Sequence, residues 1–220
     1  MYFVVRQSAY SMFFLSFEGI DGCGKTTQLE LLRSRLQSAG KTVVATREPG
    51  GTALAESIRN YLLNSREPLA KQTELLLFGA ARAQHVNEII RPALGRGEIV
   101  LSDRFGDSSL AYQGGGLGLD TEFIARMNGF ATGGLHTDIT FVLDLDPQIG
   151  WERRAAQRGI SSDDRIEERG LEFQNRVREA FLRLCESEPE RVFKLDAEAP
   201  AKVTHERIVK RLKERGLWPA

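Results

Sequence analysis

The sequence predicts an α/β fold in which helices cover both faces of a five-stranded parallel sheet. The first observation is that short apolar runs alternate with amphipathic stretches along the whole 220-residue chain. Such alternation is typical of parallel strands, because each strand needs a crossover connection before the next one. The second is that glycine-rich or charged segments directly follow several apolar runs, as at the carboxyl edge of an open sheet, where ligands bind.

The expected strands are short apolar runs at residues 13–17, 42–46, 99–102, 139–145 and 191–195. The expected helices carry apolar residues at helical spacing, at residues 26–39, 53–63, 72–94, 121–130, 148–157, 168–187 and 201–215. Three consecutive glycines at 114–116 predict unusual backbone angles or a tight turn.

The composition narrows the class of protein. Thirty basic and thirty acidic residues balance, which argues against a global electrostatic grip on nucleic acid. No apolar stretch is long enough to span a bilayer, so we expect no membrane contact. Cys23 and Cys185 are too few for a disulfide framework and belong to no C-x-x-C pair, which favours a reducing, cytoplasmic location.

The chain shows no internal repeat and no low-complexity linker, which predicts a single domain over residues 12–220. Residues 1–11 are expected to form a frayed N-terminal extension. The polar, arginine-containing segment at about 157–169 lies between two predicted helices. We interpret it as a short lid over a site.

Residues 19–27 read Gly-Ile-Asp-Gly-Cys-Gly-Lys-Thr-Thr, a complete G-x-x-x-x-G-K-T phosphate loop. Between a buried strand and a helix, such a loop lets backbone N–H groups converge on a polyphosphate. Lys25 supplies a cation for the terminal phosphates, and the Thr26 hydroxyl suits Mg²⁺. The motif predicts a P-loop NTPase-type sheet that binds a nucleoside triphosphate with Mg²⁺. The predicted nucleotide-binding residues are Gly19, Ile20, Asp21, Gly22, Cys23, Gly24, Lys25, Thr26 and Thr27.

Charged residues also follow the second and third strands. Arg47 opens an Arg-Glu-Pro-Gly-Gly turn, and Asp103-Arg104 follows the third strand. Asp103 suits Mg²⁺ through water and Arg104 suits a phosphate, although structural ion pairs fit both places on their own. A GTPase switch beginning at Asp103 is rejected, because no Asn-Lys-x-Asp motif follows in the sequence.

Other features are ambiguous by themselves. Phe78 and Arg82 share one helix face, where core packing and a surface pair are the usual roles. Tyr112 and Gln113 precede the glycines and offer polar groups to a base, but a flexible loop is a serious alternative, and the run alone assigns no function. The arginines of the lid suit phosphoryl transfer, while a solvated charged face explains most such runs.

Together these motifs resemble those of the bacterial thymidylate kinases, which transfer the γ-phosphoryl group of ATP to dTMP. The matching stretches are residues 17–27, 46–52, 78–82, 103–104, 111–116 and 164–167. The most specific are the Arg-Glu-Pro-Gly-Gly turn and the Tyr-Gln-Gly-Gly-Gly run. The resemblance also implies a homodimer.

The resemblance implies roles for individual side chains. Phe78 would stack on thymine and Arg82 would reach its 4-carbonyl, while Ser109 and Gln113 would read the remaining edge. Asp21 would meet the deoxyribose 3′-hydroxyl or a metal ion. The acceptor phosphate would be held by Arg47 and Arg104, with Arg59 nearby. The implied substrate-binding set is Asp21, Arg47, Glu48, Pro49, Arg59, Phe78, Arg82, Asp103, Arg104, Ser109, Tyr112 and Gln113, and the implied metal set is Thr26, Asp103 and Asp21.

Some members of this family carry a catalytic arginine in the phosphate loop, where this chain has Gly22. The cation is therefore expected from the lid, with Arg158 preferred and Arg154 in reserve, beside Lys25 and Arg104. The implied reaction is direct in-line transfer from MgATP to dTMP. Two alternatives stay open: a kinase for another nucleoside monophosphate or deoxynucleoside, and a nucleotide-dependent switch without turnover.

Overall fold

The computed structural model describes residues 12–158, 165–166 and 169–218. Five parallel strands form one sheet in the order β2-β3-β1-β4-β5, which confirms the predicted fold class. The strands are β1 (Phe14–Glu18), β2 (Val43–Arg47), β3 (Ile99–Asp103), β4 (Ile139–Asp144) and β5 (Val192–Asp196). Each begins and ends within one residue of its predicted position. The 1–11 extension and most of the predicted lid lie outside the described residues.

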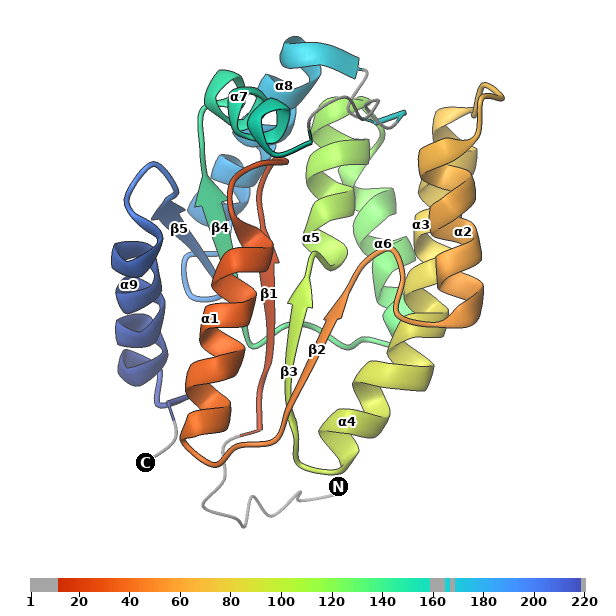
Figure 1. Cartoon of the computed structure of the whole chain (residues 1–220). Helices are drawn as coiled ribbons and strands as arrows, with labels where there is room; N and C mark the ends of the chain where they lie inside the picture. The colour runs from red at the N-terminus through yellow and green to blue at the C-terminus, as the bar shows by residue number, and fades with distance from the viewer. Residues whose placement is uncertain (1–11, 159–164, 167–168, 219–220) are drawn as a thin grey trace.

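Helices lie on both sides of this sheet (Figure 1). They are α1 (Lys25–Ser38), α2 (Ala53–Asn64), α3 (Lys71–His85), η1 (Val86–Ile90), α4 (Arg91–Gly95), α5 (Gly106–Ser109), η2 (Leu110–Gly116), α6 (Thr121–Thr132), α7 (Pro147–Arg158), α8 (Gly170–Ser187) and α9 (Ala201–Glu214). The segments η1 and η2 are π-helical. Within the described part of the chain, none of the helices has the length and apolar character needed to cross a membrane.

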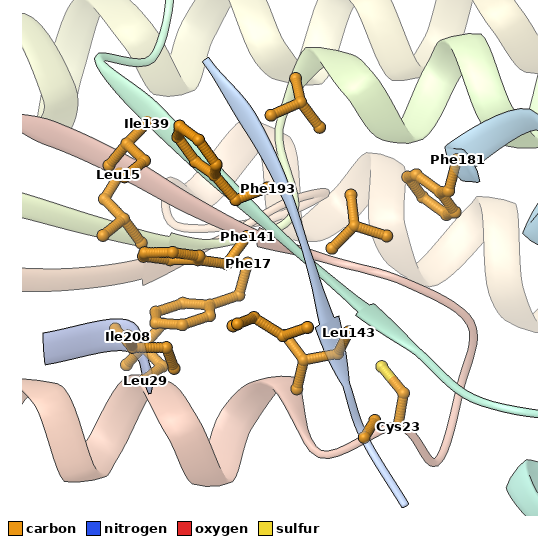
Figure 2. Close-up of a cluster of buried hydrophobic side chains, with 14 of the residues drawn as sticks. Leu15, Phe17, Cys23, Leu29, Ile139, Phe141, Leu143, Phe181, Phe193 and Ile208 are labelled. Carbon is orange, nitrogen blue, oxygen red and sulfur yellow. The ribbon is translucent and has the colours of Figure 1, made fainter. Parts of the chain in front are cut away.

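The central strand β1 is buried from both sides. Leu15 and Phe17 belong to the larger hydrophobic cluster, in which Leu29 of α1 and Ile208 of α9 also pack (Figure 2). Phe14 faces the other way and packs in a second cluster with residues of η1 and α4. Because alternate β1 side chains are held on opposite faces, the strand fixes where the phosphate loop begins.

The predicted helix at residues 72–94 is wrong in one respect: it is not a continuous α-helix. The chain widens into the π-helical η1 before α4 begins, and the Arg91 N–H bonds to the Val86 carbonyl five residues earlier. Pro92 follows directly and has no N–H to donate. A proline also clashes with the carbonyl four residues before it, which accounts for the local change of helical register.

The glycine run at 114–116 was also misinterpreted, because these residues are helical and none has a positive φ angle. Their small size serves close packing against α8 instead. A Cβ added to Gly115 would lie 2.4 Å from the Cβ of Ala180, and one added to Gly116 would lie 2.4 Å from Phe173. The run therefore brings the backbone of η2 against α8, and it is not a flexible loop.

Replacement of Gly115 by alanine is expected to destabilise the protein by about 1–3 kcal/mol, because the new methyl group overlaps with α8. Urea unfolding measures the change. The matched control is Gly129→Ala in α6, where no atom lies within 4 Å of the added Cβ. That control should be neutral or stabilising by up to about 1 kcal/mol. Equal stability of the two variants would contradict the packing argument.

Candidate active site

The phosphate loop between β1 and α1 has the backbone that a glycine-rich anion-binding turn requires. Gly19, Gly22 and Gly24 have φ angles of 132°, 80° and 95°, which side chains with a Cβ rarely adopt. A Cβ on Gly22 would also lie 2.4 Å from the carbonyl oxygen of Gly150. The loop thus depends on glycine for both its conformation and its close contact with α7.

Lys25 and Thr26 lie at the start of α1, where the loop ends. The Lys25 Nζ donates to the carbonyl oxygens of Gly19 and Ile20, at 3.2 Å and 3.0 Å. The Thr26 hydroxyl donates to the Asp103 carboxylate at 2.7 Å, which joins the loop to the end of β3. Among the described residues, no group of three His, Cys, Asp or Glu side chains could hold a metal ion.

Arg104 connects the phosphate loop to a second hollow. Its guanidinium donates to the Gly19 carbonyl at 3.0 Å, to the Tyr112 hydroxyl at 3.0 Å and to the Asp21 carboxylate at 2.5 Å. Burial alone would raise the pKa of Asp21, but the charges of Arg104, Lys25 and Arg154 outweigh it and lower this pKa to about 2. Asp21 is therefore ionised and held between two cations.

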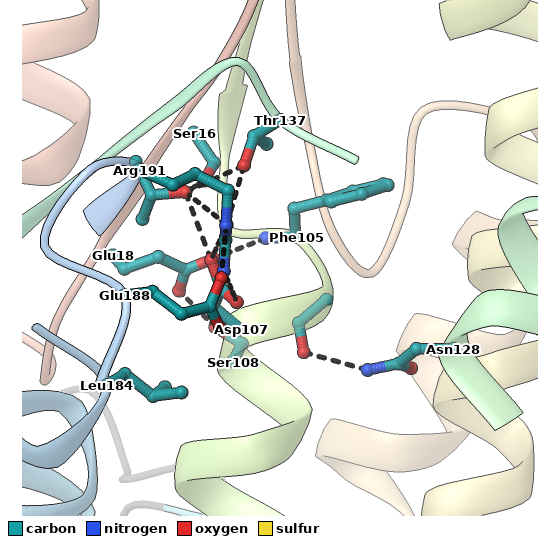
Figure 3. Close-up of polar contacts among 12 residues, drawn as sticks. Ser16, Glu18, Phe105, Asp107, Ser108, Asn128, Thr137, Leu184, Glu188 and Arg191 are labelled. Carbon is teal, nitrogen blue, oxygen red and sulfur yellow. Dashed lines mark hydrogen bonds and ion pairs between the residues drawn. The ribbon is translucent and has the colours of Figure 1, made fainter. Parts of the chain in front are cut away.

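Glu18 supports the turn that carries Arg104. Its carboxyl group is fully buried and accepts from the Phe105 N–H at 2.7 Å and from the Ser108 hydroxyl at 2.6 Å (Figure 3). Burial, with the nearby charge of Asp107, raises the pKa of Glu18 to about 8. Asp107 itself accepts from Arg191 at 2.7 Å and 2.9 Å, so a buried polar network extends behind the turn.

Two adjoining hollows lie at the carboxyl edge of the sheet. The first, of about 360 Å³, is lined by the phosphate loop together with Arg47, Asp103 and Arg154. Its size is within the range of small-molecule sites. The second is lined by apolar and polar side chains: Pro49, Leu63, Phe78, Ser108, Ser109, Tyr112, Gln113 and Ile166. Both hollows share Asp21, Glu48, Arg59 and Arg104, which places the predicted donor and acceptor residues side by side.

Arg82 occupies a different position from its neighbour Phe78. It is buried and donates to Glu48, Ser109, Asn128 and the Phe105 carbonyl at 2.7–3.1 Å. Those four bonds use four of the five N–H groups of a guanidinium. Arg82 is not among the residues that line the second hollow, so its predicted contact with a base stays a prediction.

The remaining predicted arginines differ in their surroundings. Arg47 is exposed, and one nitrogen of its guanidinium, Nη2, donates to both carboxylate oxygens of Glu56 at 2.8 Å and 2.9 Å. Arg59 donates to the carbonyl of Pro49 at 3.0 Å. Arg154 lines the first hollow. Arg158 ends α7, but its side chain lies outside the described residues, as do Asp164 and Glu167 of the lid.

Cys23 is a core residue. Its side chain is buried in the larger hydrophobic cluster, and burial raises the pKa of its thiol. The Cβ of an alanine at position 19 would lie 2.9 Å from its sulfur. The Lys25 Nζ lies 3.8 Å from this sulfur, but burial outweighs its charge, so the thiol belongs to the packing beneath the loop.

Sequence reasoning missed Glu18, Ser108 and Glu74 as residues of the site. Glu18 ends a strand that is apolar except for Ser16, and a charged residue at that place is a visible sign of a buried polar role. Glu74 stands four residues before Phe78 and eight before Arg82, on the same face of α3. That spacing is the signal which the sequence offered. For Ser108 the sequence offers no signal apart from its closeness to Arg104 along the chain.

The raised pKa of Glu18 predicts a dependence of stability on pH. Because its folded-state pKa of about 8 exceeds the usual 4.5, its contribution is full below pH 4.5 and is lost as the pH rises through 8. Glu18→Gln removes this titration. The difference in unfolding free energy, wild type minus variant, should fall with pH across that range, by at most about 1.4 kcal/mol per pH unit. Urea unfolding at several pH values measures it, and parallel pH profiles would refute the assignment.

Comparison with known proteins agrees with this geometry. The sequence profile of the family described as thymidylate kinase matches residues 17–208. The chain is 49% identical over 195 residues to the thymidylate kinase of Gloeobacter violaceus, covering 89% of this chain and 92% of that protein. It is 47% identical over 203 residues to the thymidylate kinase of Deinococcus radiodurans, covering 92% and 97%.

A solved structure shares the fold. The crystal structure of thymidylate kinase from Ehrlichia chaffeensis superposes with a TM-score of 0.74 at 37% sequence identity. The alignment covers 92% of this chain and 99% of that one. The chain belongs to the thymidylate kinase family.

Proposed function

We propose that this protein transfers the γ-phosphoryl group of ATP to dTMP, giving ADP and dTDP. The observation that carries the proposal is the position of Arg104. Its guanidinium contacts the phosphate loop at Gly19 and also lines the second hollow, beside Phe78 and Gln113. One cation therefore contacts both hollows, where in-line transfer requires charge neutralisation and alignment.

The phosphate loop is the donor side. Its backbone N–H groups and Lys25 bind the phosphates of ATP in the way that P-loops do. Thr26 and Asp103 have the hard oxygen atoms that suit Mg²⁺, which when bound would neutralise phosphate charge. The hydrogen-bonded pair of Thr26 and Asp103 supports this assignment, because both residues line the first hollow together with Lys25.

The second hollow is the acceptor side. Phe78 offers a ring face to a base, and Ser109, Tyr112 and Gln113 offer polar groups around it. The residues assigned to the deoxyribose and phosphate are Asp21, Arg47, Glu48, Pro49, Arg59 and Arg104. Arg82 does not line this hollow but holds two residues that do, through its hydrogen bonds to Glu48 and Ser109.

The chemistry needs no strong general base, because the acceptor phosphate oxygen is already a nucleophile. Lys25 and Arg104 hold the reacting groups in line and offset their negative charge. A further cation comes from the lid side, from Arg158 or from Arg154, which lines the first hollow. Exclusion of water by the lid would suppress ATP hydrolysis.

The decisive experiment is an acceptor panel assayed by ADP release, with the variant Lys25→Met. We expect release that depends on dTMP, and a loss of roughly 10²–10³-fold in turnover in the variant, because an electrostatic stabiliser of the transferred group is removed. Lys202→Met, at an exposed position on α9, is the matched control and should keep wild-type turnover. Preference for dCMP, UMP or a deoxynucleoside would refute the dTMP assignment. ADP release independent of any acceptor would favour a switch.

We infer that the protein works in the reducing cytoplasm.

We also infer that two copies of the chain associate through the layer that α2, α3 and α6 form. Of the ten large hydrophobic side chains exposed among the described residues, five lie on these three helices: Leu54, Tyr61, Leu76, Phe123 and Phe130. Phe130 is 89% exposed. An apolar layer of this kind supports an interface between copies.

Phe130→Asp places a charge on this surface and should raise the dimer dissociation constant by about tenfold or more, because desolvated aromatic residues dominate interfaces. Sedimentation velocity over a range of concentrations measures the association. Val203→Asp introduces the same charge at an exposed apolar position on α9 and should leave association unchanged. An equal effect of both substitutions would contradict the assigned interface.

A further inference from the structure

Glu74 of α3 is a buried carboxylate next to the second hollow, which is called the acceptor hollow from here on. The reaction described above does not use Glu74. Its side chain is 1% exposed. It accepts from the Gln113 Nε2 at 3.0 Å, from the Arg165 guanidinium at 2.8 Å and from Arg169. Gln113 of η2 and the two arginines that precede α8 therefore converge on one carboxylate.

The charge state of Glu74 determines how Gln113 is oriented. Burial would raise the pKa of Glu74, but the hydrogen bonds from Arg169 and Gln113 and the charges of the two arginines outweigh it and lower this pKa. An ionised carboxylate accepts hydrogen bonds and donates none. Only the NH₂ end of the Gln113 amide can therefore face Glu74.

The other end of that amide is the carbonyl oxygen Oε1. Gln113 lines the acceptor hollow, and among the described residues no donor to its Oε1 is found. With the nitrogen held on Glu74, the oxygen is the end of the amide that is left to face the hollow which Gln113 lines. A base bound there meets a hydrogen-bond acceptor at this point.

An acceptor at this position distinguishes two pyrimidines. Thymine carries a hydrogen on ring atom N3 and can donate it, whereas N3 of cytosine is itself an acceptor. An acceptor facing an acceptor leaves both groups unpaired, and this penalty is larger than the gain from one good hydrogen bond. Arg82 already uses four of its N–H groups inside the protein, so Gln113 has a large share of the discrimination.

We propose that Glu74 is a positioning residue that sets acceptor specificity: it holds the Gln113 amide so that its oxygen selects a base with a ring N–H donor. This inference rests on the proposed function, in which the second hollow binds dTMP. Glu74 itself does not contact the base. It acts through the amide, and it acts because a carboxylate has no hydrogen to offer.

The test compares kcat/KM for dTMP with kcat/KM for dCMP. Glu74→Gln introduces a donor, which lets the Gln113 amide turn its NH₂ toward the base. We expect the dTMP to dCMP ratio to fall about tenfold, the scale of one mispaired hydrogen bond. Glu74→Asp keeps an acceptor-only side chain, so its ratio should stay within about threefold of wild type even if both constants drop. Glu98→Gln, which alters a carboxylate paired with Arg96 away from the site, is the matched control and should leave the ratio unchanged.

A charge-conserving double variant covers the case in which Glu74→Gln does not fold. Glu74→Gln combined with Gln113→Glu exchanges the two groups, keeps one negative charge within this pair of positions, and again presents an acceptor to the base. Its ratio should return to within about threefold of wild type, with folding checked by circular dichroism.

The outcomes separate the two proposals. Wild-type protein that releases no ADP with dTMP would refute the proposed function. An active wild type with an unchanged ratio in folded Glu74→Gln would overturn the role of Glu74. A folded double variant that lacks the dTMP preference would overturn it equally.

Discussion

The site depends on the backbone at Arg104, which has a φ angle of +73°. This left-handed conformation is unfavourable for a residue with a side chain and persists only where the surroundings hold it. The Arg104 N–H donates to the Phe17 carbonyl, the Ser102 hydroxyl donates to the Arg104 carbonyl, and Glu18 holds the next N–H. The paired ends of β1 and β3 therefore determine where this guanidinium lies. Without that turn, the two hollows would not share a cation.

Much of the fold follows from residue patterns that the sequence displays openly. The five strands are buried apolar runs in a parallel sheet, and their positions were predicted to within one residue. The phosphate loop was predictable because its spaced glycines, lysine and threonine are all required by the same phosphate-binding turn. The motifs after the strands lie together because all carboxyl ends meet at one edge of the sheet.

The remaining features depend on contacts between segments far apart in the sequence. Nothing near Gly115 reveals that Ala180 lies against it, so the run was taken for a turn when it serves close packing. Arg82 was assigned to the base by resemblance, while its actual neighbours Glu48 and Asn128 come from a turn and another helix. Glu74 lies on the same helical face as Phe78, but only the fold brings Gln113 within hydrogen-bond distance of it. Burial and partner identity are tertiary properties, which local patterns do not encode.

The contact between η2 and α8 has a consequence for how this hollow can change. Where two helices touch through glycine and alanine, no layer of adjustable side chains lies between their backbones to absorb a displacement. The position of η2, which carries Tyr112 and Gln113, is therefore set by the path of α8. A bulkier residue at Ala180 would displace both side chains without changing the identity of any residue that lines the acceptor hollow. Substrate preference in this protein is thus open to change from a helix surface that no substrate touches.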